Sequence, residues 1–228
     1  MADNLTLVIG NKNYSSWSMR PWVLLRQLGL AFEERKLRFH SQEWNEQIER
    51  WSPSRLVPVL WRGGEAVWDT LAIMEAVNEW YPERGVWPRE ARARAFARSA
   101  AAEMHSGFRE LRSHMPMNIR ASHPGKGMSA QVQANIDRIE VLWGEARKRF
   151  GAGGPFLFGE FSAADAMYAP VVMRFRTYAV KLSPEASRYC EAMLAAPGVR
   201  SWIEDALKEK EFVAEDELYA TTPLIPNR

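Results

Sequence analysis

A short apolar run, a polar loop and a helix-like run open this chain, and they constrain its fold more than any other feature. Residues 5–9 are apolar and end at Gly10, whereas residues 23–28 have helical apolar spacing and end at Gly29. The polar segment 11–22 lies between these two runs. The pattern predicts a strand, a loop and a helix in immediate succession.

The polar segment gathers hydrogen-bonding side chains where the helix is expected to begin. Ser15, Ser16 and Ser18 lie there together with an asparagine. The backbone N–H groups at a helix start lack partners and the helix dipole is positive there, so the place suits an anion such as a thiolate. Serine is also the default N-cap residue, and the segment taken alone favours plain capping.

The next stretch continues with alternating strand and helix patterns. The expected elements are a strand within 32–39, a helix over 43–51 capped by Ser41, strands at 59–61 and 66–68, and a helix that Asp69 and Thr70 open before Pro82. Pro58, directly before a strand, fits its first residue or an edge. A split βαβ unit followed by ββα is the arrangement of a thioredoxin-like domain, so we expect that domain over residues 1–82.

The remaining chain has helical patterns only. We expect a linker at 83–88 and an all-helical domain over 89–228. Helical spacing covers 89–115, 129–150, the stretch from 162 to about 175, 184–195 and 198–210, and the tail 221–228 is expected to be extended. Ser162 and Asp165 form a capping box in its Asp variant. Pro170 lies inside the helix that follows and should remove a hydrogen bond or bend it.

Composition excludes several classes of function. The net charge of +2 gives no reason to expect nucleic acid or an anionic membrane as a partner. The single cysteine, Cys190, allows no internal disulfide and no multi-cysteine metal site, so we expect no metal. No apolar run is long enough to span a bilayer and the N-terminus does not resemble a signal peptide, so a cytoplasmic location is expected.

At this point the chain resembles the cytosolic glutathione transferases over nearly its whole length. The segment 15–20, Ser-Ser-Trp-Ser-Met-Arg, is similar to the Ser-Ser-Cys-x-x-Arg signature of the zeta class, and we read the chain as a bacterial-type member. Val57-Pro58 stands where the family has its cis-proline loop, and Asp69-Thr70 where it usually has Glu/Gln-Ser. Trp17 replaces the zeta cysteine, so a mechanism that needs that thiol is excluded.

The resemblance implies that glutathione is the co-substrate and that its thiolate lies at the first helix. Ser15 is the first candidate to donate a hydrogen bond to the sulfur and Ser16 is the alternate, with help from the amides of Ser16 and Trp17. Tyr14 is a rival donor, because other classes use tyrosine, although a packed aromatic is the more ordinary role. Arg20 could place a positive charge behind the thiolate site, or it could be an ordinary solvated or salt-bridged side chain, and the sequence favours neither role.

The resemblance also implies contacts for the rest of glutathione. Val57, before a cis Pro58, would pair its backbone with the cysteinyl unit. Thr70 would bind the γ-glutamyl carboxylate and Asp69 its ammonium, although both also suit helix capping. His40 and Arg55 are the candidates for the glycine carboxylate.

The electrophile is expected between the two domains. The candidate lining residues are Tyr14, Met104, Phe108, Arg109, Arg112 and Arg174, with Arg176 as a further possibility. The arginines hint at an acidic substrate, although a solvated cationic face with salt bridges explains them as simply, and Met104 and Phe108 equally suit a core.

Three functions fit these residues. The first is a detoxifying glutathione transferase that forms or exchanges thioethers on small electrophiles. The second is a glutathione-dependent cis/trans isomerase of the maleylacetoacetate type, and the third is a non-catalytic binding protein with the same fold. The family expectation is a homodimer, in which the helix bearing Phe96 and Ala100 and the third helix of the first domain face the partner.

Overall fold

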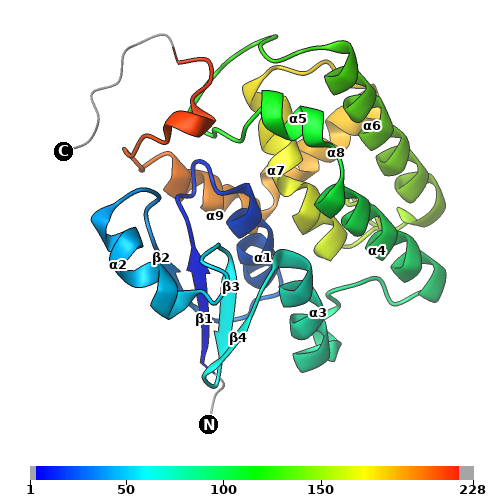
Figure 1. Ribbon diagram of the computed structural model, residues 1–228. Helices are drawn as coiled ribbons and strands as arrows, with labels where there is room; N and C mark the ends of the chain where they lie inside the picture. The colour runs from blue at the N-terminus through cyan, green and yellow to red at the C-terminus, as the bar shows by residue number, and fades with distance from the viewer. Residues whose placement is uncertain (1–3, 221–228) are drawn as a thin grey trace.

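The computed structural model describes residues 4–220, and its first part is a four-stranded mixed sheet (Figure 1). The strands are β1 (Leu5–Ile9), β2 (Glu33–Lys36), β3 (Val59–Arg62) and β4 (Glu65–Val67), in the order β2-β1-β3-β4. β1 pairs with β2 in parallel and with β3 antiparallel, and β3 pairs antiparallel with β4. This is the thioredoxin-like arrangement that the sequence predicts.

Alternation along β1 separates the two faces of this sheet. Leu7 and Ile9 belong to the main core, on the face that α1 (Ser16–Gln27) and α3 (Thr70–Trp80) cover. Val8 points to the opposite face, where it packs with Ile48 of α2 (Gln42–Trp51) and with Val59. A strand with period-two burial on both faces needs a layer on each side, and the helices supply it.

The helix starts of this part follow their capping residues. Ser41 accepts a hydrogen bond from the Trp44 amide at α2, and Asp69 accepts one from the Leu71 amide at α3. Each side chain satisfies a backbone donor that the helix itself leaves without a partner. Both predicted helix starts are therefore confirmed.

The second part is helical. Its elements are η1 (Pro82–Arg84), α4 (Ala91–Ser106), α5 (Arg109–His114), α6 (Ala130–Phe150), α7 (Ala163–Thr177), α8 (Pro184–Ala195), α9 (Pro197–Ala206) and η2 (Ala214–Asp216). Figure 1 shows α4 to α8 gathered on one side, with α9 returning to the sheet. No helix within 4–220 combines the length and apolarity that crossing a bilayer requires. The predicted tail 221–228 lies outside the described residues.

One predicted helix is wrong as a continuous element. The apolar spacing over 89–115 suggests one helix, but α4 ends at Ser106 and the separate α5 begins at Arg109. Between them Phe108 has a left-handed backbone conformation with φ of 55°. A Cβ on Gly107 would lie 2.7 Å from the Glu103 carbonyl oxygen, so only glycine allows this tight helix end. Similarly, α9 ends at Ala206 and not at 210.

Helix α7 is the buried centre of the helical part. The capping box at its start is confirmed, with Asp165 Oδ2 accepting from the Ser162 amide at 2.9 Å. Asp165 Oδ1 accepts from the Leu157 amide and the Tyr189 hydroxyl, and burial raises the pKa of this carboxyl to about 6. The helix continues through Pro170, which has no N–H to donate.

The sheet part and the helical part share one core. Helix α1 packs between the sheet and α7, and the Arg20 Nε donates to the Met167 carbonyl of α7 at 3.0 Å. The Trp202 indole of α9 donates to the Lys12 carbonyl at 2.9 Å, just ahead of α1. The start of α1 is therefore held from both parts of the chain.

Candidate active site at the start of helix α1

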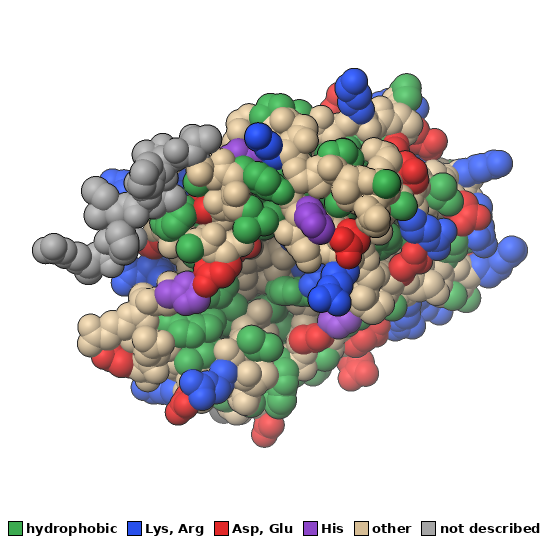
Figure 2. Space-filling model, turned by 45° about the horizontal axis from the view of Figure 1, so that its top comes forward, with side chains coloured by type: hydrophobic (Ala, Val, Ile, Leu, Met, Phe, Trp, Pro, Cys, Tyr) green, Lys and Arg blue, Asp and Glu red, His purple; other side chains and the backbone are tan. Residues whose placement is uncertain are grey.

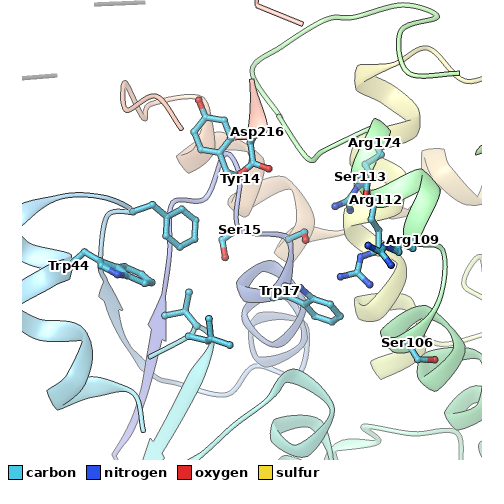
Figure 3. A pocket seen from close by; sticks show the side chains of 14 residues that line it. Tyr14, Ser15, Trp17, Trp44, Ser106, Arg109, Arg112, Ser113, Arg174 and Asp216 are labelled. Carbon is cyan, nitrogen blue, oxygen red and sulfur yellow. The ribbon is translucent and has the colours of Figure 1, made fainter. Parts of the chain in front are cut away.

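A cavity of about 650 Å³ opens at the start of α1, between the sheet part and the helical part. Figure 2 shows this face of the molecule hollowed, and Figure 3 shows the lining side chains. The lining residues are Tyr14, Ser15, Ser16, Trp17, Phe39, Trp44, Leu56, Val57, Ser106, Arg109, Arg112, Ser113, Arg174 and Asp216. The cavity thus brings together segments from almost the whole length of the chain.

Ser15 lies at the N-cap of α1, but its side chain does not cap the helix. Its Oγ instead donates to the Oγ of Ser18 at 2.8 Å, and Ser18 Oγ accepts from the Gly10 amide at 3.2 Å. Ser15 is 6% exposed and lines the cavity, whereas Ser18 is buried behind it. Ser15, the residue expected to cap the helix, is therefore oriented by the Ser18 hydroxyl and not by a capping hydrogen bond.

The backbone amides at this helix start are not equivalent. The Ser16 amide donates to the Tyr14 carbonyl at 2.8 Å, so this expected donor already has a partner. The Trp17 amide, in the first turn, has no intrahelical acceptor. A ligand anion at the helix start would therefore meet the Ser15 hydroxyl and the Trp17 amide before the Ser16 amide.

The Trp17 ring lies among cationic side chains. The Arg20 guanidinium is 4.1 Å from the ring centroid and that of Arg112 is 4.8 Å away, both within cation–π range. His105 of α4 meets the ring edge-on at 5.1 Å. Trp17 thus joins the sheet part to α4 and α5.

Tyr14 directs its hydroxyl away from Ser15. The hydroxyl donates to Glu217 Oε1 at 2.6 Å and accepts from Arg120 Nη2 at 2.8 Å, and Figure 3 shows it at the far end of the ring. Burial, followed by the hydrogen bond to Glu217, raises the pKa of Tyr14 to about 12. In this arrangement the ring lines the cavity while the hydroxyl fastens the C-terminal segment.

The wall on the sheet side is apolar. It consists of Phe39, Trp44, Leu56 and Val57, and the Val57–Pro58 peptide bond is cis, as the resemblance implies. Phe39 and Trp44 meet edge-on with ring centroids 5.1 Å apart. Leu56 is 68% exposed at the cavity rim.

Asp69 and Thr70 lie beside the cavity without lining it. The Thr70 hydroxyl is buried and donates to the Trp17 carbonyl at 3.2 Å. The exposed Asp69 carboxylate accepts from the Leu71 amide and lies 3.2 Å from His105 Nε2. Thr70 therefore supports the start of α1, whereas Asp69 joins α3 to α4.

Four further candidates also lie outside the lining. His40 is exposed and 3.4 Å from Glu215, and Arg55 pairs with Glu49 at 3.2 Å. Met104 and Phe108 are buried in the main core. Helical spacing correctly places these last two on an apolar face, but it does not distinguish a core position from a cavity wall.

The wall on the helical side is cationic. Arg109 and Arg112 come from α5 and Arg174 from α7, whereas Arg176 is exposed elsewhere on α7. Arg174 is 4% exposed, and its Nε and Nη1 donate to the carbonyls of Met115 and Pro170 at 2.8 and 3.3 Å. Burial, followed by repulsion from Arg112, lowers the pKa of Arg174 to about 10.

Several site residues were not expected from the sequence. Ser18, Ser106 and Ser113 add hydroxyls at or behind the cavity, and Asp216 adds a carboxylate. Burial raises the pKa of Asp216 to about 6. The spacing of Ser15 and Ser18 could have indicated that their hydroxyls lie close together, since residues three apart share a helix face. No local pattern marks Asp216, which the fold brings back from near the C-terminus.

The C-terminal segment that carries Asp216 is fastened to the loop before α1. The buried Glu209 carboxylate accepts from the amides of Lys12 and Asn13 at 2.9 and 3.0 Å and from Lys36 Nζ at 3.0 Å. Arg120 donates to the carbonyls of Glu209 and Glu211. Within residues 4–220 no three side chains form a group that could hold a metal ion.

A thioredoxin-like sheet with a cis-proline loop, followed by helices that close a cavity over α1, defines the class of two-part thioredoxin-fold proteins. The family described as "Glutathione S-transferase, N-terminal domain" matches residues 14–80. The family described as "Glutathione S-transferase, C-terminal domain" matches residues 78–205. The chain belongs to the glutathione S-transferase family.

Named relatives are distant. The probable maleylacetoacetate isomerase of Caenorhabditis elegans is 22% identical over 174 residues, covering 75% of this chain and 79% of that protein. The maleylacetoacetate isomerase of Rattus norvegicus is 23% identical over 174 residues, covering 75% of this chain and 78% of that protein. These values do not distinguish a transferase from an isomerase.

Solved structures share the fold. A glutathione transferase homolog from Burkholderia gl BGR1, crystallised with bound glutathione, is 24% identical with a TM-score of 0.67. The alignment covers 89% of this chain and 98% of that one. The human glutathione S-transferase T1-1, in its apo form, is 19% identical with a TM-score of 0.63, and 94% of each chain is covered.

Proposed function

We propose that this protein is a glutathione transferase that attaches the glutathione thiolate to small electrophiles. The observation that carries the proposal is the Ser15 hydroxyl, which lines the cavity at the start of α1 and is bonded to Ser18 behind it. Family membership and the likeness to a structure with bound glutathione support the choice of thiol.

The chemistry follows from the acidity of a thiol. A free thiol is mostly protonated near neutral pH, and the thiolate is the nucleophile. A hydroxyl that donates to the sulfur favours the ionised form, and the positive end of the α1 dipole acts in the same direction. The neutral Ser15 hydroxyl is far too weak a base to take up the thiol proton, so in this proposal that proton passes to solvent.

The contact with Ser18 allows Ser15 to donate its proton to the sulfur. Hydroxyl protons rotate, so the 2.8 Å contact can carry a proton from either oxygen. When Ser18 donates to Ser15, the Ser15 proton becomes available to the sulfur. Ser16 remains the alternate donor, because it also lines the cavity.

The remaining contacts of glutathione are proposed along the sheet side. The backbone of Val57 beside the cis Pro58 would pair with the cysteinyl unit, and Trp17 would pack against it. Thr70 and Asp69, at the start of α3, would hold the γ-glutamyl end through the helix-start amides and the exposed carboxylate. His40 or Arg55 remains a proposal for the glycine carboxylate, and either would have to leave its present carboxylate partner.

The transfer itself balances without a further reactant. The thiolate sulfur attacks the electrophilic carbon and forms a C–S bond. In a substitution, the leaving group departs with the electron pair of the bond that breaks. In an addition to a double bond, the displaced electron pair takes up a proton from solvent.

Turnover tests this proposal directly. Glutathione affinity and turnover with a chlorodinitrobenzene acceptor are measured for the unaltered protein, for Ser15→Ala and for Ser99→Ala, an exposed serine on α4 that serves as control. Loss of one donor to a developing or existing anion typically costs about 10²–10³ in rate. We expect a loss of that order in Ser15→Ala only, and unchanged turnover would remove Ser15 from the mechanism.

A second candidate is a glutathione-dependent cis/trans isomerase. Two observations favour it, namely the names of the relatives from C. elegans and R. norvegicus and the arginines on the helical wall of the cavity. Against it, Trp17 occupies the position of the zeta cysteine. Isomerisation of the unsaturated dicarboxylate maleylacetoacetate decides between the two, because a transferase without isomerase activity leaves that substrate in its cis form.

Other parts of the proposal concern the whole molecule. We propose a cytoplasmic homodimer with domains at 1–82 and 89–228 joined by 83–88. In the structure Ala100 is buried and Phe96 packs near Phe150 and Phe158, so both residues also serve the subunit's own core. A non-catalytic role would be supported if glutathione failed to bind.

A further inference from the structure

Four arginines surround the Trp17 side of the cavity without a carboxylate partner. Within residues 4–220, Arg20, Arg109, Arg112 and Arg174 form no ion pair. Arg20 donates to the carbonyls of Met167 and Ser16, and its Nη2 is buried with no partner. Arg112 reaches only two carbonyls, at 3.4 and 3.5 Å. The hydrogen-bond acceptors of Arg20, Arg112 and Arg174 are therefore neutral carbonyl oxygens, and Arg20 and Arg112 also contact the Trp17 ring face.

This arrangement of charges is costly. Arg20 is fully buried and Arg174 is 4% exposed, so neither charge is well solvated. Burial lowers the pKa of both groups; repulsion from Arg174 and Arg112 adds to this for Arg20, and repulsion from Arg112 for Arg174. Burial alone lowers the pKa of Arg112. A bound anion would relieve both effects, because a carboxylate accepts two parallel hydrogen bonds from a guanidinium.

One carboxylate of the chain faces the same cavity. Asp216 lines it from the C-terminal segment, and Arg174 is the nearby cation that favours its ionised form. The two side chains do not form an ion pair, and Asp216 is not hydrogen-bonded to any of the four arginines. Figure 3 shows Asp216 near Tyr14, with Arg109, Arg112 and Arg174 on the other side of the view. Asp216 thus compensates the arginines only from a distance.

We infer that Arg174, Arg112 and Arg109 form an anion subsite that binds a carboxylate of the second substrate, with Asp216 as a built-in competitor for that subsite. The inference rests on the proposed function, since it defines the class of electrophile as one that carries a carboxylate. Ser106 and Ser113 also line this wall and offer hydroxyls to the same group. The apolar wall of Phe39, Trp44 and Val57 is left for glutathione and for the uncharged part of the electrophile.

The glycine carboxylate of glutathione is the other possible source of the anion. Succinate separates the two sources, because it carries carboxylates but no electrophilic double bond. It is titrated calorimetrically into the protein alone and into the protein saturated with glutathione. Succinamide, which has the same length without charge, is the control ligand. If glutathione abolishes succinate binding, the subsite belongs to glutathione and the inference is overturned.

Substitutions then test the residues. We expect Arg174→Met to weaken succinate binding at least tenfold and Arg109→Gln severalfold, with glutathione affinity unchanged in both. Arg200→Gln, an exposed arginine on α9, removes the same charge away from the cavity and should have no effect. Arg109 is exposed on α5, so Arg109→Gln tests the inference even if Arg174→Met does not fold.

For Asp216→Asn we expect the opposite change in succinate affinity. Removal of the competing charge should tighten succinate binding severalfold without changing the affinity for succinamide. The inference is overturned if the protein binds succinate no better than succinamide, or if the Arg109 and Arg174 variants bind it as the unaltered protein does. Succinate binding that persists when glutathione does not bind would leave the subsite standing while the proposed transferase function fails.

Discussion

The Ser15 and Ser18 hydroxyls lie 2.8 Å apart at the start of α1, and only Ser15 reaches the cavity. Ser18 is buried and also accepts from the Gly10 amide at the end of β1. The pair therefore connects the strand to the surface on which the sulfur is proposed to lie. Because the inner hydroxyl is fixed by a backbone donor, it orients the outer one.

Replacement of Ser15 by Ala should raise the pKa of the thiol of bound glutathione. A hydrogen bond to a charged group contributes about 1.5–3 kcal/mol, which corresponds to about 1–2 pKa units. The ultraviolet absorbance of the thiolate, followed against pH in the binary complex, measures this shift. A thiol pKa equal to that in the unaltered protein would exclude Ser15 as the donor.

Replacement of Ser18 by Ala should have a smaller effect on the thiol and a measurable effect on stability. The Gly10 amide loses its acceptor, and a buried donor without a partner costs about 1–3 kcal/mol. Urea unfolding measures this loss, and the same thiolate titration reports the effect on Ser15. If Ser18→Ala changes neither quantity, the inner hydroxyl does not orient the outer one.

Replacement of Thr70 by Val should loosen the contact between α3 and α1. The buried hydroxyl donates to the Trp17 carbonyl, and its loss should cost about 1 kcal/mol of unfolding free energy. Thr70→Ser keeps the hydroxyl and serves as control. Glutathione affinity that falls more than tenfold in Thr70→Val, while Thr70→Ser binds normally, would support its proposed contact with the γ-glutamyl end.

Replacement of Glu209 by Gln should destabilise the loop before α1. The carboxylate accepts from two backbone amides and from Lys36, whereas an amide side chain offers a single acceptor oxygen and adds a donor. We expect a loss of about 2–3 kcal/mol in unfolding free energy. Glu204→Gln, on the exposed side of α9, is the matched control, and equal stability of the two variants would contradict the expectation.

Anion binding should depend on pH through Asp216. Its pKa is raised to about 6, so it becomes neutral as the pH falls through that value and no longer opposes a bound anion. The affinity for ethanedisulfonate, whose charge is constant, should therefore increase severalfold between about pH 7.5 and about pH 5.

The control for this pH dependence is Asp216→Asn. The charged groups around Asp216 are Arg174 of α7, Glu215 and Glu217 of its own segment, and His40 ahead of α2. All four remain in the variant, so any pH dependence that they cause also remains. An identical pH profile in the two proteins would show that Asp216 does not control the subsite.

The sequence by itself determined the elements that local rules govern. The apolar run at 5–9 predicts a strand, and the caps at Ser41, Asp69 and Ser162 predict helix starts, all of which the structure has. These signals succeed because each depends on residues within one turn or one strand. The candidate site at the start of α1 came instead from the resemblance to a family, because the local pattern alone favours plain capping.

Only the tertiary structure decided which side chains meet in the cavity. The close approach at Gly107 ends α4 and starts α5 as a separate helix, which carries Arg109 and Arg112 at the cavity wall. The Tyr14 hydroxyl is hydrogen-bonded to Glu217, which lies 203 positions further along the chain. Asp216, from the same distant segment, lines the cavity. Such contacts depend on the closure of long loops, and no local pattern of residues records where those loops close.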